Sequence, residues 1–224
     1  MRLALFGGSF DPPHRGHLAI ARAAIQRLGI DRVWMAPVGA QPLKPDGFST
    51  SFTDRLAMVE LTVANDPEII PLDIDAPRSD GQPNYTIDVL SAIRADLPPT
   101  DHLFFLLGAD AFLSLKQWHG AEQLPLLCDF IVAGRPGFSI DDVASALPSG
   151  LLAEHDPAAN DSPQLVTWLL KKGYSTRSRL YLMPDLQEDI SATHIRAALA
   201  GEESEEGVLS PLVLRYIRDR GLYR

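Results

Sequence analysis

Short apolar runs recur along the chain, and most are followed by a stretch in which apolar residues return every three or four positions. A short continuous apolar run is typical of a buried strand, and the longer spacing is typical of one face of a helix. The runs predict strands at 3–6, 32–38, 68–72, 102–107, 129–133 and 179–183. The spaced stretches predict helices at 18–28, 54–65, 85–97, 141–147, 163–173, 189–201 and 211–221, with one or two short helices within 108–128.

Polar residues, glycine and proline mark several of the expected helix ends. Gly29 follows the last apolar position of the first helix, where a left-handed residue commonly ends a helix. Thr53 precedes the second helix and is the expected N-cap. Pro211 stands in the first turn of the last helix, where its missing N–H costs nothing.

The alternation of strands and helices predicts an α/β fold, with a doubly wound, Rossmann-like parallel sheet, helices on both faces and a C-terminal helical segment. The loops at 7–16, 37–52, 73–84, 108–120 and 133–138 each follow a predicted strand. Ligands of such sheets bind beyond the carboxyl ends of the strands, so these loops are expected to share one site. We expect one domain over residues 1–224, in which residues 139–178 are the least regular part.

The loop after the first predicted strand reads GGSFDPPHRGH, and it holds more glycine, proline and histidine than a simple connection between a strand and a helix requires. Gly7 and Gly8 allow the backbone to approach a ligand closely. His14 and His17 are hydrogen-bond donors, and together with Arg15 they are expected to offer positive charge. The stretch therefore predicts an anion-binding site at the start of a helix.

Composition and charge disfavour several classes of protein. The formal net charge of −9 disfavours a general nucleic-acid binder, because such proteins usually carry a basic surface. Cys128 is the only cysteine, which excludes an intramolecular disulfide and is typical of a reducing compartment. The first residues lack the apolar core of a signal peptide, and no stretch approaches the ~18–20 apolar residues of a membrane span. We therefore expect a cytoplasmic protein that binds neither nucleic acid nor a membrane.

The motifs resemble those of the nucleotidyltransferases that carry an H-x-G-H signature, here at residues 14–17. ISATHIR at 190–196 is similar to the second signature of that group, with Ala192 where a serine usually stands. PLKP at 42–45 with Arg55, NYTIDVL at 84–90 and GADAFLSLKQWH at 108–119 resemble the bacterial nicotinate-nucleotide adenylyltransferase family. The resemblance covers nearly the whole chain apart from residues 139–178.

The resemblance implies transfer of AMP from ATP to nicotinate mononucleotide, which gives nicotinate adenine dinucleotide and pyrophosphate in NAD biosynthesis. The partners are then ATP and nicotinate mononucleotide, with Mg²⁺ bound mainly through the ATP phosphates and no metal-binding residues on the protein. The attacking phosphate is already an anion, so catalysis requires mainly positioning and charge stabilisation. A homo-oligomer is left open.

The resemblance also implies roles for individual residues. The expected catalytic residues are His14 and His17, with His17 stabilising the α-phosphate in the transition state. The expected ATP and phosphate ligands are Gly7, Gly8, Ser9, Lys44, Ser191, Thr193 and Arg196. The expected nicotinate mononucleotide ligands are Tyr85, Thr86, Asp110, Trp118 and His119.

Plainer interpretations stay open for several of these residues. Lys44 can be an ordinary solvated lysine, and Arg55 can serve only to pair with a nearby acid. Trp118 can belong to the core instead of stacking on a pyridine ring, and Asp110 can cap a helix. His194 is expected to face solvent.

The alternative functions are adenylyl transfer to nicotinamide mononucleotide or phosphopantetheine, a fragment of an aminoacyl-tRNA synthetase, and a nucleotide sensor without turnover.

Overall fold

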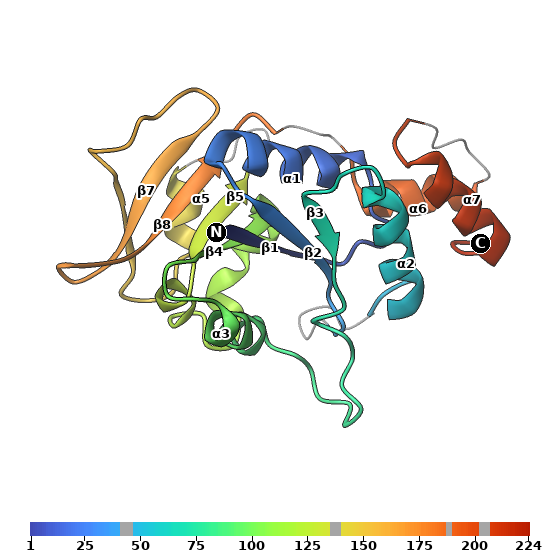
Figure 1. Ribbon diagram of the computed structural model, residues 1–224, viewed down its shortest axis with the longest axis horizontal. Helices are drawn as coiled ribbons and strands as arrows, with labels where there is room; N and C mark the ends of the chain where they lie inside the picture. The colour runs from blue at the N-terminus through green and yellow to red at the C-terminus, as the bar shows by residue number, and fades with distance from the viewer. Residues whose placement is uncertain (41–46, 135–139, 187–189, 202–206) are drawn as a thin grey trace.

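The computed structural model describes residues 1–40, 47–134, 140–186, 190–201 and 207–224 (Figure 1). Within this part of the chain, eight strands form one sheet in the order β3-β2-β1-β4-β5-β8-β7-β6. The strands are β1 Arg2–Gly8, β2 Arg32–Pro37, β3 Ile69–Pro71, β4 His102–Gly108, β5 Asp129–Ala133, β6 Leu152–His155, β7 Val166–Lys172 and β8 Ser175–Met183. The neighbours from β3 through β8 are parallel, which confirms the predicted doubly wound α/β fold.

Helices cover both faces of the sheet. The helices are α1 Arg15–Leu28, α2 Phe52–Val63, α3 Thr86–Asp96, α4 Ala109–Leu113, α5 Ile140–Ala146, α6 Ala192–Ala200 and α7 Pro211–Arg220, with 3-10 turns at Leu115–Gln117 and Leu124–Leu126. Successive residues of β1 belong to different cores, because side chains of a strand alternate between faces. Leu3 and Leu5 pack with α3, α4 and α5, whereas Ala4 and Phe6 pack with α1 and α2.

A third apolar cluster holds the C-terminal helices against α2 instead of against the sheet. Met58 of α2, Ile195 of α6 and Val213 and Ile217 of α7 are all buried in it. Figure 1 shows these three helices together at one end of the molecule, with β7 and β8 at the other end. This third cluster therefore joins α6 and α7 to α2, the helix that follows residues 47–51.

The predicted helix at 163–173 is wrong, because the chain forms strand β7 there. Leu165, Trp168 and Leu169 also fit a helical spacing, so the short apolar stretch was ambiguous. Pairing with both β6 and β8 decides the conformation, and these pairs are antiparallel, which corrects the prediction of a purely parallel sheet. Residues 140–178 thus extend the sheet through β6, β7 and the first part of β8, which begins at Ser175 and not at 179.

The strand order reverses direction between β1 and β4, and the candidate site lies at this point. Phe6 pairs with Leu106, so Gly8 and Gly108, each two residues further on, end adjacent strands at the same sheet edge. A topological switch point of this kind opens a crevice between the loops that leave the two strands.

Among the described residues, no helix is long and apolar enough to span a membrane.

Candidate active site

The loop between β1 and α1 is built around a buried phenylalanine. Phe10 is 1% exposed, has φ 47°, and packs edge-on against Phe6 and His17, with ring centroids 5.4 and 4.9 Å away. A Cβ on Gly8 would lie only 2.9 Å from the Phe10 ring, whereas a Cβ on Gly7 would lie 3.6 Å from Phe105. The glycine at position 8 therefore makes room for Phe10, a structural reason that the sequence did not reveal.

His14 and His17 stand together at the start of α1. Their ring centroids are 3.8 Å apart, and the backbone N–H of His14 donates to Nδ1 of His17 at 3.1 Å. An Nδ1 that accepts a hydrogen bond carries no proton, so the neutral His17 ring keeps its proton on Nε2. His17 is therefore prepared to donate one hydrogen bond through Nε2.

Both histidines are neutral at pH 7, which corrects the expectation that they offer positive charge. Burial, and then the neighbouring Arg15, lower the pKa of His14 to about 4. Burial, and then His14, hold the pKa of His17 well below its ordinary 6.5. The pair thus offers dipoles to a ligand, and charge must come from elsewhere in the site.

The start of α1 is partly covered by the segment that precedes α7. The backbone N–H of Arg15 donates to the carbonyl of Val208 at 2.9 Å, and its guanidinium donates to the carbonyl of Gly207 at 2.9 Å. The first amide of the helix is therefore already used, which reduces the number of N–H groups that the helix start can offer a phosphate.

The second motif meets the first loop through one arginine. Arg196 of α6 donates from Nη1 to the carbonyl of Asp11 at 2.8 Å and from Nη2 to Oγ1 of Thr193 at 3.2 Å. Ser191 is the N-cap residue of α6, although its side chain makes no capping hydrogen bond. His194 is exposed, as expected. The fold therefore places the guanidinium of Arg196 beside the histidine loop, at a sequence separation of 185 residues from Asp11.

Arg55 lies under the same loop and is not among the predicted ligands. Its side chain is 1% exposed, and its Nη1 donates to the carbonyl of Ser9 at 2.8 Å. The guanidinium lies 3.7 Å above the centroid of the Phe48 ring. Burial lowers the pKa of Arg55, and the nearby carboxylates of Asp11 and Asp75 oppose this shift. Within the described ranges Arg55 forms no direct ion pair, so its attraction to these acids acts at longer range.

A sequence signal for Arg55 existed. Arg55 precedes Met58 and Val59 by three and four positions, which places a charged residue on the buried stripe of α2. A fully buried arginine is rare unless it is paired, so such a residue indicates a specific task. Here that task includes holding the backbone at Ser9.

The expected nicotinate mononucleotide ligands gather beyond β4. Tyr85, the N-cap residue of α3, lies against His119 with ring centroids 4.3 Å apart and an interplanar angle of 30°. Trp118 is half-buried, donates from Nε1 to Ser114 Oγ at 2.8 Å and packs edge-on against Phe105. Both proposed uses of Trp118, as core residue and as ring platform, are compatible with this position.

Two further residues complete the group beyond β4. Thr86 is the first residue of α3, and Asp110 is exposed in the first turn of α4.

Comparisons with known proteins show the family to which the chain belongs. Residues 5–198 match the family model described as "Cytidylyltransferase-like". The chain is 36% identical to "Probable nicotinate-nucleotide adenylyltransferase" of Citrifermentans bemidjiense, over all of this chain and 98% of that protein. It is 35% identical to the protein of the same name from Chromobacterium violaceum, over all of this chain and 99% of that protein. The chain belongs to the cytidylyltransferase-like family and, within it, to the nicotinate-nucleotide adenylyltransferases.

A solved structure of this family has the same fold. "Plasmodium falciparum nicotinic acid mononucleotide adenylyltransferase complexed with NaAD" superposes with a TM-score of 0.70 at 21% identity, over 99% of this chain and 97% of that chain.

In this adenylyltransferase family member, the fold places the predicted ligands in two groups, one at the end of β1 and one on the segments that follow β3 and β4. The first group comprises Gly7 and Gly8 at the end of β1, then Ser9, His14 and His17, and Arg196 joins them from α6. Tyr85, Thr86, Asp110, Trp118 and His119 follow β3 and β4. Lys44 and the rest of PLKP lie outside the described residues. The roles of all these residues in binding stay predictions.

Proposed function

We propose that this protein transfers AMP from ATP to nicotinate mononucleotide, forming nicotinate adenine dinucleotide and pyrophosphate. The observation that carries the proposal is the meeting of the two phosphate motifs, in which Arg196 donates to the carbonyl of Asp11 in the loop that leads to His14 and His17. The names of the curated relatives, which match this chain over its whole length, support the same reaction.

The chemistry assigned to the site is an in-line displacement. A phosphate oxygen of nicotinate mononucleotide forms a bond to the α-phosphorus of ATP, and the bond from that phosphorus to the bridging oxygen breaks. The electron pair leaves with pyrophosphate, and no proton has to be removed from the attacking anion. The protein therefore contributes positioning and stabilisation of charge, without a nucleophile or a general base.

The neutral histidines suit this task. Nε2–H of His17 is assigned to an oxygen of the α-phosphate, where negative charge shifts during the displacement, and His14 to a neighbouring phosphate oxygen. The guanidinium of Arg196 supplies the positive charge that the histidines lack at pH 7, and we assign it to the departing pyrophosphate. Two of its donor groups already hold Asp11 and Thr193, which fixes its direction.

The metal enters this scheme as part of the substrate, MgATP. Mg²⁺ keeps several waters and binds readily to substrate phosphates, so it needs few protein ligands. We infer that Mg²⁺ is held mainly by the phosphates of ATP and by water.

The acceptor is assigned to the group beyond β4. Tyr85 and Thr86 stand at the start of α3, where the first N–H groups lack partners within the helix and can donate to a ring carboxylate. The backbone N–H of Trp118 already donates to Leu115 at 3.0 Å, so the donors expected from that turn are reduced and those of α3 matter more. The indole of Trp118 is assigned to the face of the pyridine ring, and Asp110 to the ribose.

The decisive experiment measures pyrophosphate release by the purified protein with ATP and Mg²⁺, with each candidate acceptor supplied in a separate reaction. Nicotinate mononucleotide should give pyrophosphate and the dinucleotide in equal amounts, and nicotinamide mononucleotide should react more slowly. Turnover only with phosphopantetheine would assign a different adenylyl acceptor. Binding of ATP without turnover for any acceptor would replace the proposal with a nucleotide sensor.

A further inference from the structure

Asp11 joins the histidine loop to three other parts of the molecule. Its carboxylate is 3% exposed and accepts the backbone N–H of Ser49 at 2.6 Å, the hydroxyl of Thr50 at 2.8 Å and the hydroxyl of Tyr223 at 2.6 Å. Its backbone carbonyl accepts Nη1 of Arg196 at 2.8 Å. A buried carboxylate is costly unless its oxygens are satisfied, so these donors fix where Asp11 can lie.

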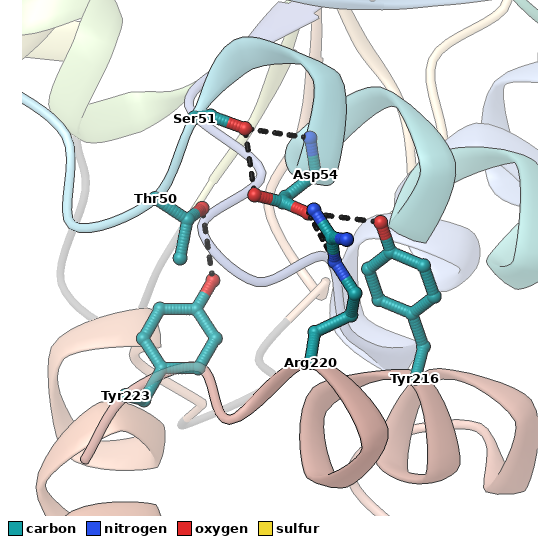
Figure 2. Close-up of polar contacts among 6 residues, drawn as sticks. All are labelled: Thr50, Ser51, Asp54, Tyr216, Arg220 and Tyr223. Atoms are coloured by element: carbon teal, nitrogen blue, oxygen red, sulfur yellow. Dashed lines mark hydrogen bonds and ion pairs between the residues drawn. The ribbon is translucent and has the colours of Figure 1, made fainter.

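Tyr223 reaches this carboxylate from the segment that follows α7. The helix ends at Arg220, and Gly221 turns the chain with φ 62°. Tyr223 itself has φ 62°, a left-handed conformation that is uncommon outside glycine, which the surrounding contacts must hold. Figure 2 shows its hydroxyl pointing at Thr50, and the two hydroxyls, 3.5 Å apart, both donate to the same oxygen of Asp11.

We propose that Tyr223 is a positioning residue for adenylyl transfer, which holds the histidine loop in place through Asp11. This inference rests on the proposed function. Asp11 stands three residues before His14, and the intervening residues, Pro12 and Pro13, are both buried, so a displacement of Asp11 is passed on to the start of α1. The same displacement moves the carbonyl that orients Arg196. Loss of one hydroxyl at position 223 therefore disturbs both phosphate motifs through Asp11.

The chain contains a matched control for this hydroxyl. Tyr216 also comes from the C-terminal segment and donates to a buried aspartate, Asp54, at 2.9 Å (Figure 2). Asp54 additionally accepts Ser51 Oγ at 2.6 Å and Arg220 at 3.1 Å. These contacts join α7 to the start of α2 and include no residue of loop 9–14, so Tyr216→Phe removes a comparable hydrogen bond that has no direct contact with the histidine loop.

The test compares Tyr223→Phe with Tyr216→Phe in steady-state assays with ATP, Mg²⁺ and nicotinate mononucleotide. We expect kcat of Tyr223→Phe to fall about 10-fold with less than about 2-fold change in the KM of nicotinate mononucleotide, because small displacements of aligned groups mainly slow the chemical step. Tyr216→Phe should keep the kcat of the parent protein. Thermal unfolding of both variants should shift by similar amounts, since each loses one hydroxyl from a buried aspartate.

Two further measurements separate positioning from general stability. Amide hydrogen exchange in the peptide covering residues 9–17 should be faster in Tyr223→Phe and unchanged in Tyr216→Phe. In a double-mutant cycle, Tyr223→Phe should add little to the loss of kcat already caused by Asp11→Ala, because alanine has no oxygen to accept the Tyr223 hydroxyl and both changes break the same connection.

Equal kcat values for the two tyrosine variants, or fully additive effects of Tyr223→Phe and Asp11→Ala, would overturn the proposal. If the parent protein releases no pyrophosphate, the proposed function fails, and equal exchange at residues 9–17 in both variants would then overturn the connection as well.

Discussion

A single methyl group at Gly8 should destabilise the protein, while the same change at the neighbouring Gly7 should not. A Cβ at position 8 would lie 2.9 Å from two atoms of the Phe10 ring, closer than carbon atoms approach without a shift. The ring cannot swing away freely, because Phe10 is 1% exposed and packs against Phe6 and His17. A Cβ at position 7 would make an ordinary contact at 3.6 Å with Phe105.

The magnitude follows from the cost of overpacking a core. Inserting a methyl group where the surroundings cannot yield typically costs about 1–3 kcal/mol. Neither glycine has a positive φ, so backbone strain does not add to the comparison. Gly8→Ala should therefore lower the free energy of unfolding by about 1–3 kcal/mol, and Gly7→Ala should change it by less than about 0.5 kcal/mol. For a chain of this length each kcal/mol corresponds to about 2–4 °C in Tm.

The assay is urea unfolding of the parent protein and both variants, with thermal unfolding as a second measure. Phe10 lies against His17, so we also expect Gly8→Ala to lower kcat. Equal stability of the two variants, or a larger loss in Gly7→Ala, would refute the explanation of Gly8 as the residue that makes room for Phe10.

Four further predictions test the site. His17→Ala should lower kcat by about 10²–10³ with a smaller effect on KM, and an effect on KM alone would reduce His17 to a ground-state ligand. Arg196→Ala should raise the KM of ATP, and an unchanged value would remove it from the site. The kcat/KM for nicotinate mononucleotide should exceed that for nicotinamide mononucleotide by at least ~10-fold, and Trp118→Ala should weaken the binding of nicotinate mononucleotide but not of ATP. Equal turnover of the two mononucleotides would contradict the assignment of the acceptor pocket. The pKa of His14 is about 4 in the folded protein against 6.5 in the unfolded chain, so the unfolded chain binds more protons between these values. The stability that neutral His14 contributes is thus present above pH 6.5 and is lost as the pH falls toward 4. Urea unfolding at pH 7 and pH 5 measures this loss, and the free energy of unfolding should decrease less between the two pH values in His14→Asn than in the parent protein.

Local sequence patterns predict a helix end correctly where the residues that form that end are close together in the sequence. Gly29 ends α1 with φ 58°, and α7 begins at Pro211, both at the predicted positions. The N-cap of α2 was misplaced by two residues, since Ser51 accepts the N–H of Asp54 and Thr53 lies inside the helix. Ser and Thr are similar caps, so a sequence that offers both leaves the choice to the geometry of the preceding chain.

The amino-acid sequence by itself determined the alternation of strands and helices, the edge at which the loops meet and the two phosphate motifs, because these depend on periodicity and on short stretches of chain. Only the tertiary structure decided that residues 163–173 form a strand, since pairing with β6 and β8 outweighs an ambiguous local preference. It also decided that the histidines are neutral, because their pKa values are lowered mainly by burial, which depends on how the folded chain packs around them. Asp11 meets Arg196 and Tyr223 across 185 and 212 residues, and no local rule relates positions so distant until the chain has folded.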